Sequence, residues 1–308
     1  MRLASLILAV AVAAPAVAAN SGPFTVRETG KSYNHLQQAV WAIGNGDGAI
    51  EIAPGRYRDC AVQEGGRVAY LAAQQGTVVF DGGACEGKAT LVLRGVAAHV
   101  EGITFAHVAV RDGNGAGIRL ERGNLGVVDD HFVDSQSGIL SADDSAASIR
   151  VDKSTFSGLG ACPSGGCAHS IYIGNYGSLS VTNSRFERGT GGHYVKSRSA
   201  RIEVLNSSFD DSHGQSTNYM IDLPGGAVGR IAGNTFVQGP NKENHSAFIT
   251  VAAEGVANPS RGLVIEDNTA SMSPGVSWPS DFVADFSHEQ LAIRNNKLGK
   301  GLTLFEQR

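Results

Sequence analysis

The sequence predicts an all-β fold: a single-stranded right-handed parallel β-helix, a solenoid of about ten coils with a short N-terminal capping helix. Three observations lead to this prediction: a phrase that repeats along the chain, apolar residues that alternate within each repeat, and an excess of glycine. The 308 residues include 40 Gly, and only 18% are charged. Such a composition favours short strands joined by tight turns over charged helices.

A six-residue phrase that starts with an apolar residue and ends with Phe recurs along the chain. Its copies are VEGITF, VVDDHF, VDKSTF, VTNSRF, VLNSSF and IAGNTF, ending at Phe105, Phe132, Phe156, Phe186, Phe209 and Phe236. With weaker copies near Ala270 and Leu298, the average spacing from Phe105 to Leu298 is about 28 residues, which suits one coil of several short strands. Apolar residues alternate within each unit, as strands require. We expect the recurrent Asn to lie at a coil corner, where it tolerates a left-handed backbone and stacks on its counterparts.

The segment before the first coils predicts a cap. Leu36, Val40 and Ile43 follow the i, i+4, i+7 spacing of a short amphipathic helix. A solenoid needs a cover over its first open coil, and this segment is suited to that place. We expect one β-helix domain over residues 19–308, without a linker.

The N-terminus has the features of a signal peptide. Arg2 precedes an apolar stretch at 3–12, and Ala16-Val17-Ala18 fits a cleavage site, so we assign residues 1–18 to the leader. A membrane anchor is the alternative, but Pro15 and Asn20 interrupt it. We therefore expect a periplasmic or secreted monomer with no membrane span in the mature chain. The net charge of −4 argues against nucleic acid as a partner.

Four cysteines and three acidic pairs are candidate cross-links and ligands. An even cysteine count in an exported chain permits disulfides, and sequence proximity suggests Cys60–Cys85 and Cys162–Cys167. A zinc site is the alternative, but the spacing suits it poorly. The pairs Asp129-Asp130, Asp143-Asp144 and Asp210-Asp211 are possible Ca²⁺ ligands, although such pairs are more often solvated turns. We assign no metal ligand.

Several motifs carry a resemblance to known proteins. The segments LQQAVWAI, AIEIAPGRYRD and TVVFDGG resemble the start of pectate-lyase-like right-handed parallel β-helix proteins. HSIYIG at 169–174, GHYVKSR at 192–198, IDLPGG at 221–226 and GNTFVQGPNKEN at 233–244 resemble a bacterial subgroup with HxIYIG, GHxxKSR and IDLPxG motifs. The resemblance implies polysaccharide processing in general terms.

Aligning the strands after the repeated phrase brings a set of polar residues together. If Ile171, Val195, Ile221 and Ile249 point inward, the next position points outward, and stacked positions lie about 4.8 Å apart. That outward position holds Tyr172, Lys196, Asp222 and Thr250, and Arg198 points to the same face. We expect His193 beside this patch, with His169, Tyr194 and Tyr219 as substrate-binding residues.

This set has the chemistry for β-elimination of a uronate-containing polysaccharide. Arg198 would hold the sugar carboxylate. Lys196, with Arg198 nearby to lower its pKa, would be the base, and Tyr172 would protonate the leaving oxygen. His193 is a rival for either proton transfer. Asp222 would orient Lys196, although a counter-ion raises the pKa of a lysine.

Other interpretations remain open at this point. The alternatives are an ordinary cross-strand ion pair between Lys196 and Asp222 and packed structural roles for the histidines. The competing functions are a non-catalytic carbohydrate-binding or envelope protein and a glycoside hydrolase. A hydrolase needs two carboxyl groups, and the patch supplies only Asp222.

Overall fold

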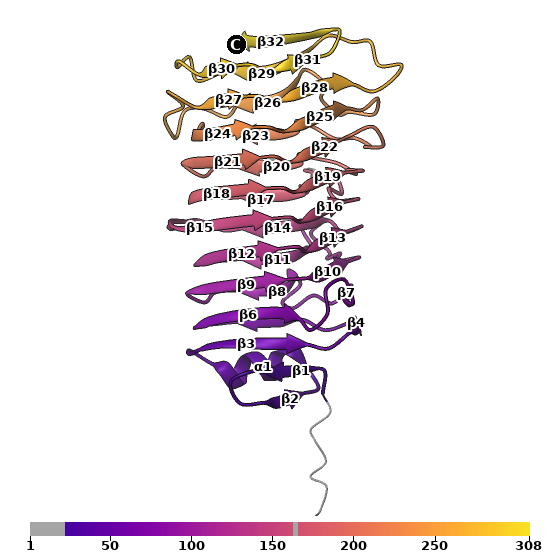
Figure 1. Ribbon diagram of the computed structural model, residues 1–308, viewed down its shortest axis with the longest axis vertical. Coiled ribbons are helices and arrows are strands. Elements are labelled where there is room, and N and C mark those ends of the chain that lie inside the picture. The colour runs from indigo at the N-terminus through magenta and orange to yellow at the C-terminus, as the bar shows by residue number, and fades with distance from the viewer. Residues whose placement is uncertain (1–21, 163–165) are drawn as a thin grey trace, which may run out of the picture.

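The computed structural model describes residues 22–162 and 166–308, which form a parallel β-solenoid of about nine turns. Figure 1 shows the coils stacked along the long axis, with the helix α1 (Leu36–Ile43) at the N-terminal end and β32 at the other. The expected signal peptide lies outside the described residues. The predicted all-β solenoid with one N-terminal helix is confirmed, and its number of turns is close to the ten coils expected.

Each coil contributes one strand to each of three sheets, which we call A, B and C. All strand pairs are parallel except those that β1 makes with β2 and β3. Sheet A contains β1 (Phe24–Val26), β2 (Lys31–Tyr33), β3 (Asp47–Ile52), β6 (Arg67–Ala72), β9 (Ala97–Glu101), β12 (Asn124–Val128), β15 (Asp144–Asp152), β18 (Tyr176–Thr182), β21 (Arg201–Leu205), β24 (Val228–Ala232), β27 (Val264–Glu266) and β30 (Ala292–Arg294).

Sheets B and C are each ten strands deep. Sheet B contains β4 (Gly55–Tyr57), β7 (Val78–Asp81), β10 (Ile103–Ala106), β13 (His131–Val133), β16 (Thr155–Ser157), β19 (Arg185–Glu187), β22 (Ser208–Asp210), β25 (Thr235–Gln238), β28 (Thr269–Met272) and β31 (Lys297–Leu298). Sheet C contains β5 (Ala61–Gln63), β8 (Ala89–Leu93), β11 (Ala116–Leu120), β14 (Ser137–Ser141), β17 (Ile171–Ile173), β20 (Val195–Ser197), β23 (Ile221–Leu223), β26 (Ala247–Val251), β29 (Ser280–Asp285) and β32 (Leu302–Gln307).

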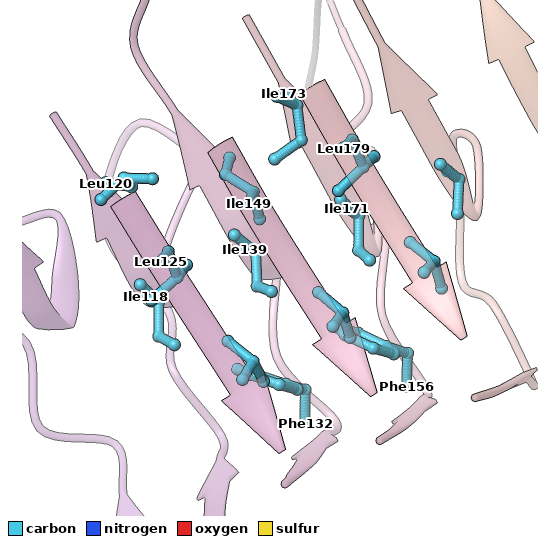
Figure 2. Close-up of a cluster of buried hydrophobic side chains, with 14 of the residues drawn as sticks. Ile118, Leu120, Leu125, Phe132, Ile139, Ile149, Phe156, Ile171, Ile173 and Leu179 are labelled. Atoms are coloured by element: carbon cyan, nitrogen blue, oxygen red, sulfur yellow. The ribbon is translucent and has the colours of Figure 1, made fainter. Parts of the chain in front are cut away.

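The core is built from rows of identical or similar side chains that stack from coil to coil. The phenylalanines that end the repeated phrase line sheet B, and the ring centroids of Phe132 and Phe156 lie 4.7 Å apart. Ile139 and Ile171 form a matching row on sheet C, as Figure 2 shows. Because every inward position meets its own counterpart above and below, the repeat buries one continuous apolar interior.

The corner between sheets A and B divides into two positions with separate tasks. The first has a left-handed backbone, with φ of 51° at Asn183 and 52° at Asn206. The second points inward and bonds to the coil on its N-terminal side: the Asn234 carboxamide oxygen accepts the Ser207 N–H at 2.8 Å. The same ladder bond is made by Asp130, Ser154, Ser184, Ser207, Asn268 and Asn296. The predicted corner is therefore confirmed, with the backbone and ladder roles on adjacent residues.

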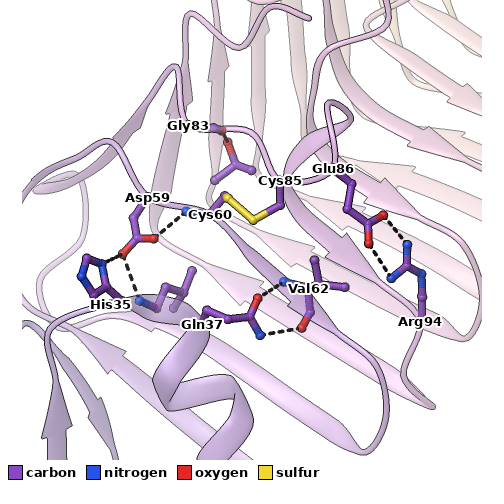
Figure 3. Close-up of a disulfide and its surroundings, with 11 residues drawn as sticks. His35, Gln37, Asp59, Cys60, Val62, Gly83, Cys85, Glu86 and Arg94 are labelled. Atoms are coloured by element: carbon purple, nitrogen blue, oxygen red, sulfur yellow. Dashed lines mark hydrogen bonds and ion pairs between the residues drawn. A yellow bond between two sulfur atoms is a disulfide. The ribbon is translucent and has the colours of Figure 1, made fainter.

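The N-terminal end is closed by α1, whose Leu36 and Val40 side chains are buried. The Gln37 side chain covers the free edge of β5, because its amide donates to the Val62 carbonyl and accepts the Val62 N–H at 3.0 and 2.7 Å. Figure 3 shows this contact beside the Cys60–Cys85 disulfide. A side-chain amide here substitutes for the backbone of a missing coil.

Both predicted disulfides, Cys60–Cys85 and Cys162–Cys167, are present. Disulfides fit an extracellular or periplasmic protein. Within residues 22–162 and 166–308, no helix is long and apolar enough to cross a membrane.

Candidate functional site

The outer face of sheet C carries the predicted column of polar residues. Tyr172 pairs in register with Lys196, Lys196 with Asp222, and Asp222 with Thr250. The inward row of Ile171, Val195, Ile221 and Ile249 is fully buried. The predicted register is therefore confirmed over β17, β20, β23 and β26.

These residues form one connected set of ion pairs and hydrogen bonds. The Lys196 ammonium lies 3.2 Å from Asp222 Oδ2 and 2.7 Å from Glu254 Oε1. Arg198 Nη2 donates to the other Glu254 oxygen at 2.5 Å, and Arg198 Nε donates to the Tyr172 hydroxyl at 3.2 Å. We call Tyr172, Lys196, Arg198, Asp222 and Glu254 the sheet C cluster. Its two cations and two carboxylates balance in charge.

The cluster is more buried than an outward strand position suggests. The side chain of Asp222 is 4% exposed and that of Lys196 is 11% exposed, whereas that of Glu254 is 47% exposed. Thr250 donates its hydroxyl to Asp222 Oδ1 at 2.7 Å, so both oxygens of this carboxylate have partners. The Lys196–Asp222 pair is therefore a desolvated pair and not a solvated surface contact.

Three rings form a second row beside the cluster. His169 and His193 have ring centroids 4.9 Å apart, and His193 stacks on Tyr219 at 5.5 Å. His169 also meets the Tyr172 ring edge-on at 5.2 Å. His193 Nε2 lies 3.5 Å from Asp222 Oδ2, which joins the ring row to the cluster.

The predicted low pKa of Lys196 is wrong. Burial alone would lower the pKa of this ammonium, but the carboxylates of Asp222 and Glu254 outweigh burial and raise it. Burial likewise opposes ionisation of Glu254, yet hydrogen bonds from Lys196 and Arg198 lower its pKa to about 2. Both groups are charged at neutral pH, so Lys196 cannot accept a proton in this state.

Both histidines of the ring row are neutral at neutral pH. Burial is the largest cause that lowers the pKa of both rings to about 3; the charge of Lys196 adds to it at His193, and His193 and then Lys196 add to it at His169. His169 Nδ1 accepts the backbone N–H of His193 at 2.9 Å, so the ring proton of His169 resides on Nε2. His193 Nδ1 is buried without a partner among the described residues. His193 Nε2 is thus a neutral imidazole nitrogen 3.5 Å from a carboxylate of the cluster.

Tyr194 does not belong to this face, contrary to the sequence-based prediction. Its side chain is 1% exposed and packs on Phe186 and Phe209 in the core. Its hydroxyl donates to Asp211 at 2.7 Å, and Asp211 pairs with the buried Lys242. Tyr194 therefore anchors the loop behind the face and is not available to a ligand.

Glu254 is the member of the cluster that the alignment of strands does not predict. It lies in the loop between β26 and β27, 58 residues after Lys196. The strand alignment stops at Thr250, four residues earlier, and loops do not keep the strand register. No pattern in the sequence around Glu254 connects it to Lys196 or Arg198.

One residue of each acidic pair considered for calcium is engaged in another contact. Asp130 accepts the Ile103 N–H at 2.7 Å inside the corner ladder, and Asp211 pairs with Lys242. Asp144 accepts the Gly123 N–H at 2.8 Å. Among the described residues, no group of three or more His, Cys, Asp or Glu is arranged to hold a metal ion.

Comparison with known proteins assigns no family to the chain. No family model matches the chain, and no curated protein matches it. Among solved structures, ORF18 of Geobacillus virus E2 is similar over 88% of this chain and 57% of its own, with 12% identity and a TM-score of 0.48. The chain thus spans little more than half the length of that protein. The β-helix fold is compatible with polysaccharide processing and with structural roles.

Proposed function

We propose that the protein is a lyase that cleaves an acidic, uronate-containing polysaccharide by β-elimination at the sheet C cluster. One observation carries the proposal: Lys196 and Arg198 donate hydrogen bonds to the two oxygens of a single carboxylate, that of Glu254, at 2.7 and 2.5 Å. A pair of cations in this geometry suits the carboxylate of a uronic acid. The phenol of Tyr172 lies within hydrogen-bond distance of one of these cations.

The roles differ from those expected from sequence. Lys196 and Arg198 would both bind the sugar carboxylate and stabilise the negative charge that develops as the C5 proton leaves. His193 would take that proton at Nε2; burial makes its ring a weak base, so the transfer depends on the stabilisation that Lys196 and Arg198 give to the developing negative charge. The electron pair of the C5–H bond forms the C4–C5 double bond, and the C4–O4 bond breaks. Tyr172 already accepts a hydrogen bond from Arg198, so its own hydroxyl proton is free to go to O4.

Binding without cleavage is the second candidate, and a specific observation favours it. Lys196 is held protonated, and His193 Nε2 faces the Asp222 carboxylate, so the free protein presents no base ready for use. The face would then bind an acidic polysaccharide at the cell envelope. A hydrolase is less suited: Glu254 supplies a second carboxyl, but hydrogen bonds to Lys196 and Arg198 keep its pKa at about 2, too low for a general acid.

One product assay separates these functions. The purified protein is incubated with alginate, polygalacturonate and glucuronan, and both ultraviolet absorbance of unsaturated uronate ends and new reducing ends are measured. The lyase produces both signals together, and a hydrolase produces reducing ends alone. Polymer binding with neither signal indicates the binding function. Neither binding nor product across the panel contradicts an acidic polysaccharide as the ligand.

Variants then test the assigned roles. Tyr172→Phe keeps the ring and removes the acid, so we expect a loss of about 10²–10⁴-fold in the rate. Arg198→Gln should weaken carboxylate binding and slow the reaction. Arg150→Gln, an exposed arginine on sheet A, is the matched control and should leave the rate unchanged. Full activity of Tyr172→Phe would remove the tyrosine from the mechanism.

A further inference from the structure

Glu254 is held in place by its backbone as well as by its side chain. Its N–H donates to the Pro224 carbonyl at 2.9 Å, and the Ala252 N–H donates to the Leu223 carbonyl at 2.8 Å. Further along the same loop, the Asn258 N–H donates to the Gly225 carbonyl at 2.8 Å. The loop that presents Glu254 therefore rests on the Leu223–Gly226 turn of the neighbouring coil.

The same loop also contacts the strand that carries the cations. The Asn258 side-chain amide donates to the Arg198 carbonyl at 3.3 Å. Three successive coils thus fix one arrangement. β20 provides Lys196, and Arg198 follows directly after this strand; the next turn supports the loop, and the loop places a carboxylate between the two cations. Because the loop backbone is already ordered, little conformational entropy is lost when the Glu254 carboxylate binds the two cations.

The position of Glu254 has the features of a displaceable group. Its side chain is 47% exposed, whereas Asp222, the other carboxylate on Lys196, is 4% exposed and bonded to Thr250. Lys196 would keep Asp222 as its partner if Glu254 left, so the buried ammonium would never be without a counter-charge. An incoming carboxylate can therefore replace Glu254 without leaving a buried charge unpaired.

We infer that Glu254 is a built-in competitor that restricts the site to carboxylate-bearing glycans. This inference rests on the proposed function. A neutral sugar offers no group that replaces both bonds of Glu254 and is rejected, whereas a uronate carboxylate exchanges for it one bond at a time. Specificity is then set as much by the group that must be displaced as by the groups that bind.

Affinity measurements test this role. Binding of polygalacturonate and alginate oligosaccharides is measured by calorimetry for the wild type, Glu254→Gln and Glu254→Ala. Glu51→Gln is the matched control, because Glu51 is similarly exposed and pairs with Arg27 on sheet A. Both Glu254 variants should bind uronate oligosaccharides at least about tenfold more tightly, since the ligand no longer displaces a charged hydrogen bond. Glu51→Gln should bind like the wild type.

A second measurement does not depend on the ligand. Acylation of Lys196 by an amine-reactive ester is followed by peptide mass spectrometry, and it should be several-fold faster in Glu254→Gln because the ammonium has lost one of two carboxylates. Uronate affinity that is unchanged or weaker in both Glu254 variants, or unchanged Lys196 acylation, overturns the competitor role while leaving the proposed function standing. Absence of uronate binding by every variant overturns both.

Discussion

Replacing Lys196 with Met tests whether the face of sheet C depends on a buried ion pair. Met keeps the length and apolar stem of the side chain and removes its charge. Asp222, with a side chain only 4% exposed, then loses the ammonium at 3.2 Å and keeps the hydroxyl of Thr250. Leaving one partner of a buried pair uncompensated costs about 3–5 kcal/mol. We expect a loss of this size in the free energy of unfolding.

Two further variants separate burial from charge. Arg198→Met breaks a pair whose partners are 34% and 47% exposed, so it should cost no more than about 1 kcal/mol. The double variant Lys196→Met/Asp222→Leu removes both buried charges and should regain most of the lost stability. Urea unfolding followed by circular dichroism measures all three against the wild type. If the free energy of unfolding of Lys196→Met is within about 1 kcal/mol of the wild-type value, the buried ion pair does not stabilise the fold as argued. If Lys196→Met loses this stability, Arg198 and Tyr172 are better residues for activity tests, because their substitution should not disturb the fold.

The histidine ring row and the corner ladder give two further predictions. His169 and His193 have pKa values of about 3 against 6.5 in the unfolded chain, so the unfolded chain binds more protons below that pH. The free energy of unfolding should therefore fall between about pH 6.5 and pH 3, by up to about 2.7 kcal/mol per pH unit, and replacing both with Gln should flatten the titration. At the corner, Asn234→Ala removes the side-chain amide that bonds both the Ser207 N–H and the Val204 carbonyl. The free energy of unfolding should therefore fall by about 2–4 kcal/mol. Asn234→Ser keeps a hydrogen-bond acceptor, as serine does in the three preceding coils, and should lower the stability less. Equal losses of stability for the two variants in thermal unfolding would contradict the role of the corner hydrogen bonds.

The repeat made the column of Tyr172, Lys196 and Asp222 predictable. Its phase is constant, so each apolar residue of one coil meets its counterpart in the next, and the residue after it must point outward. The observed pairs of Ile171 with Val195 and of Val195 with Ile221 follow from this alone. Stacking thus converts a one-dimensional repeat into a list of spatial neighbours.

The same alternation failed at Tyr194, one residue before a strand begins. β20 has only three residues, Val195–Ser197, so the period of two holds for very few positions. At the corner the backbone turns, and Tyr194 points into the core towards Asp211 instead of outward. Rules for strand faces therefore apply in this solenoid only within the hydrogen-bonded residues.

The pKa of Lys196 depended on a residue that no alignment of strands includes. The neighbouring Arg198 suggested a lysine that loses its proton easily, and Asp222 alone left the balance open. The charge of Asp222 is the largest effect that raises this pKa, and Glu254 adds to it: one loop carboxylate bonds both cations and leaves Lys196 a cation held by two acids. In this β-solenoid the strands fix which residues share the face, and the loop between β26 and β27 adds the carboxylate that a ligand must replace at Lys196 and Arg198.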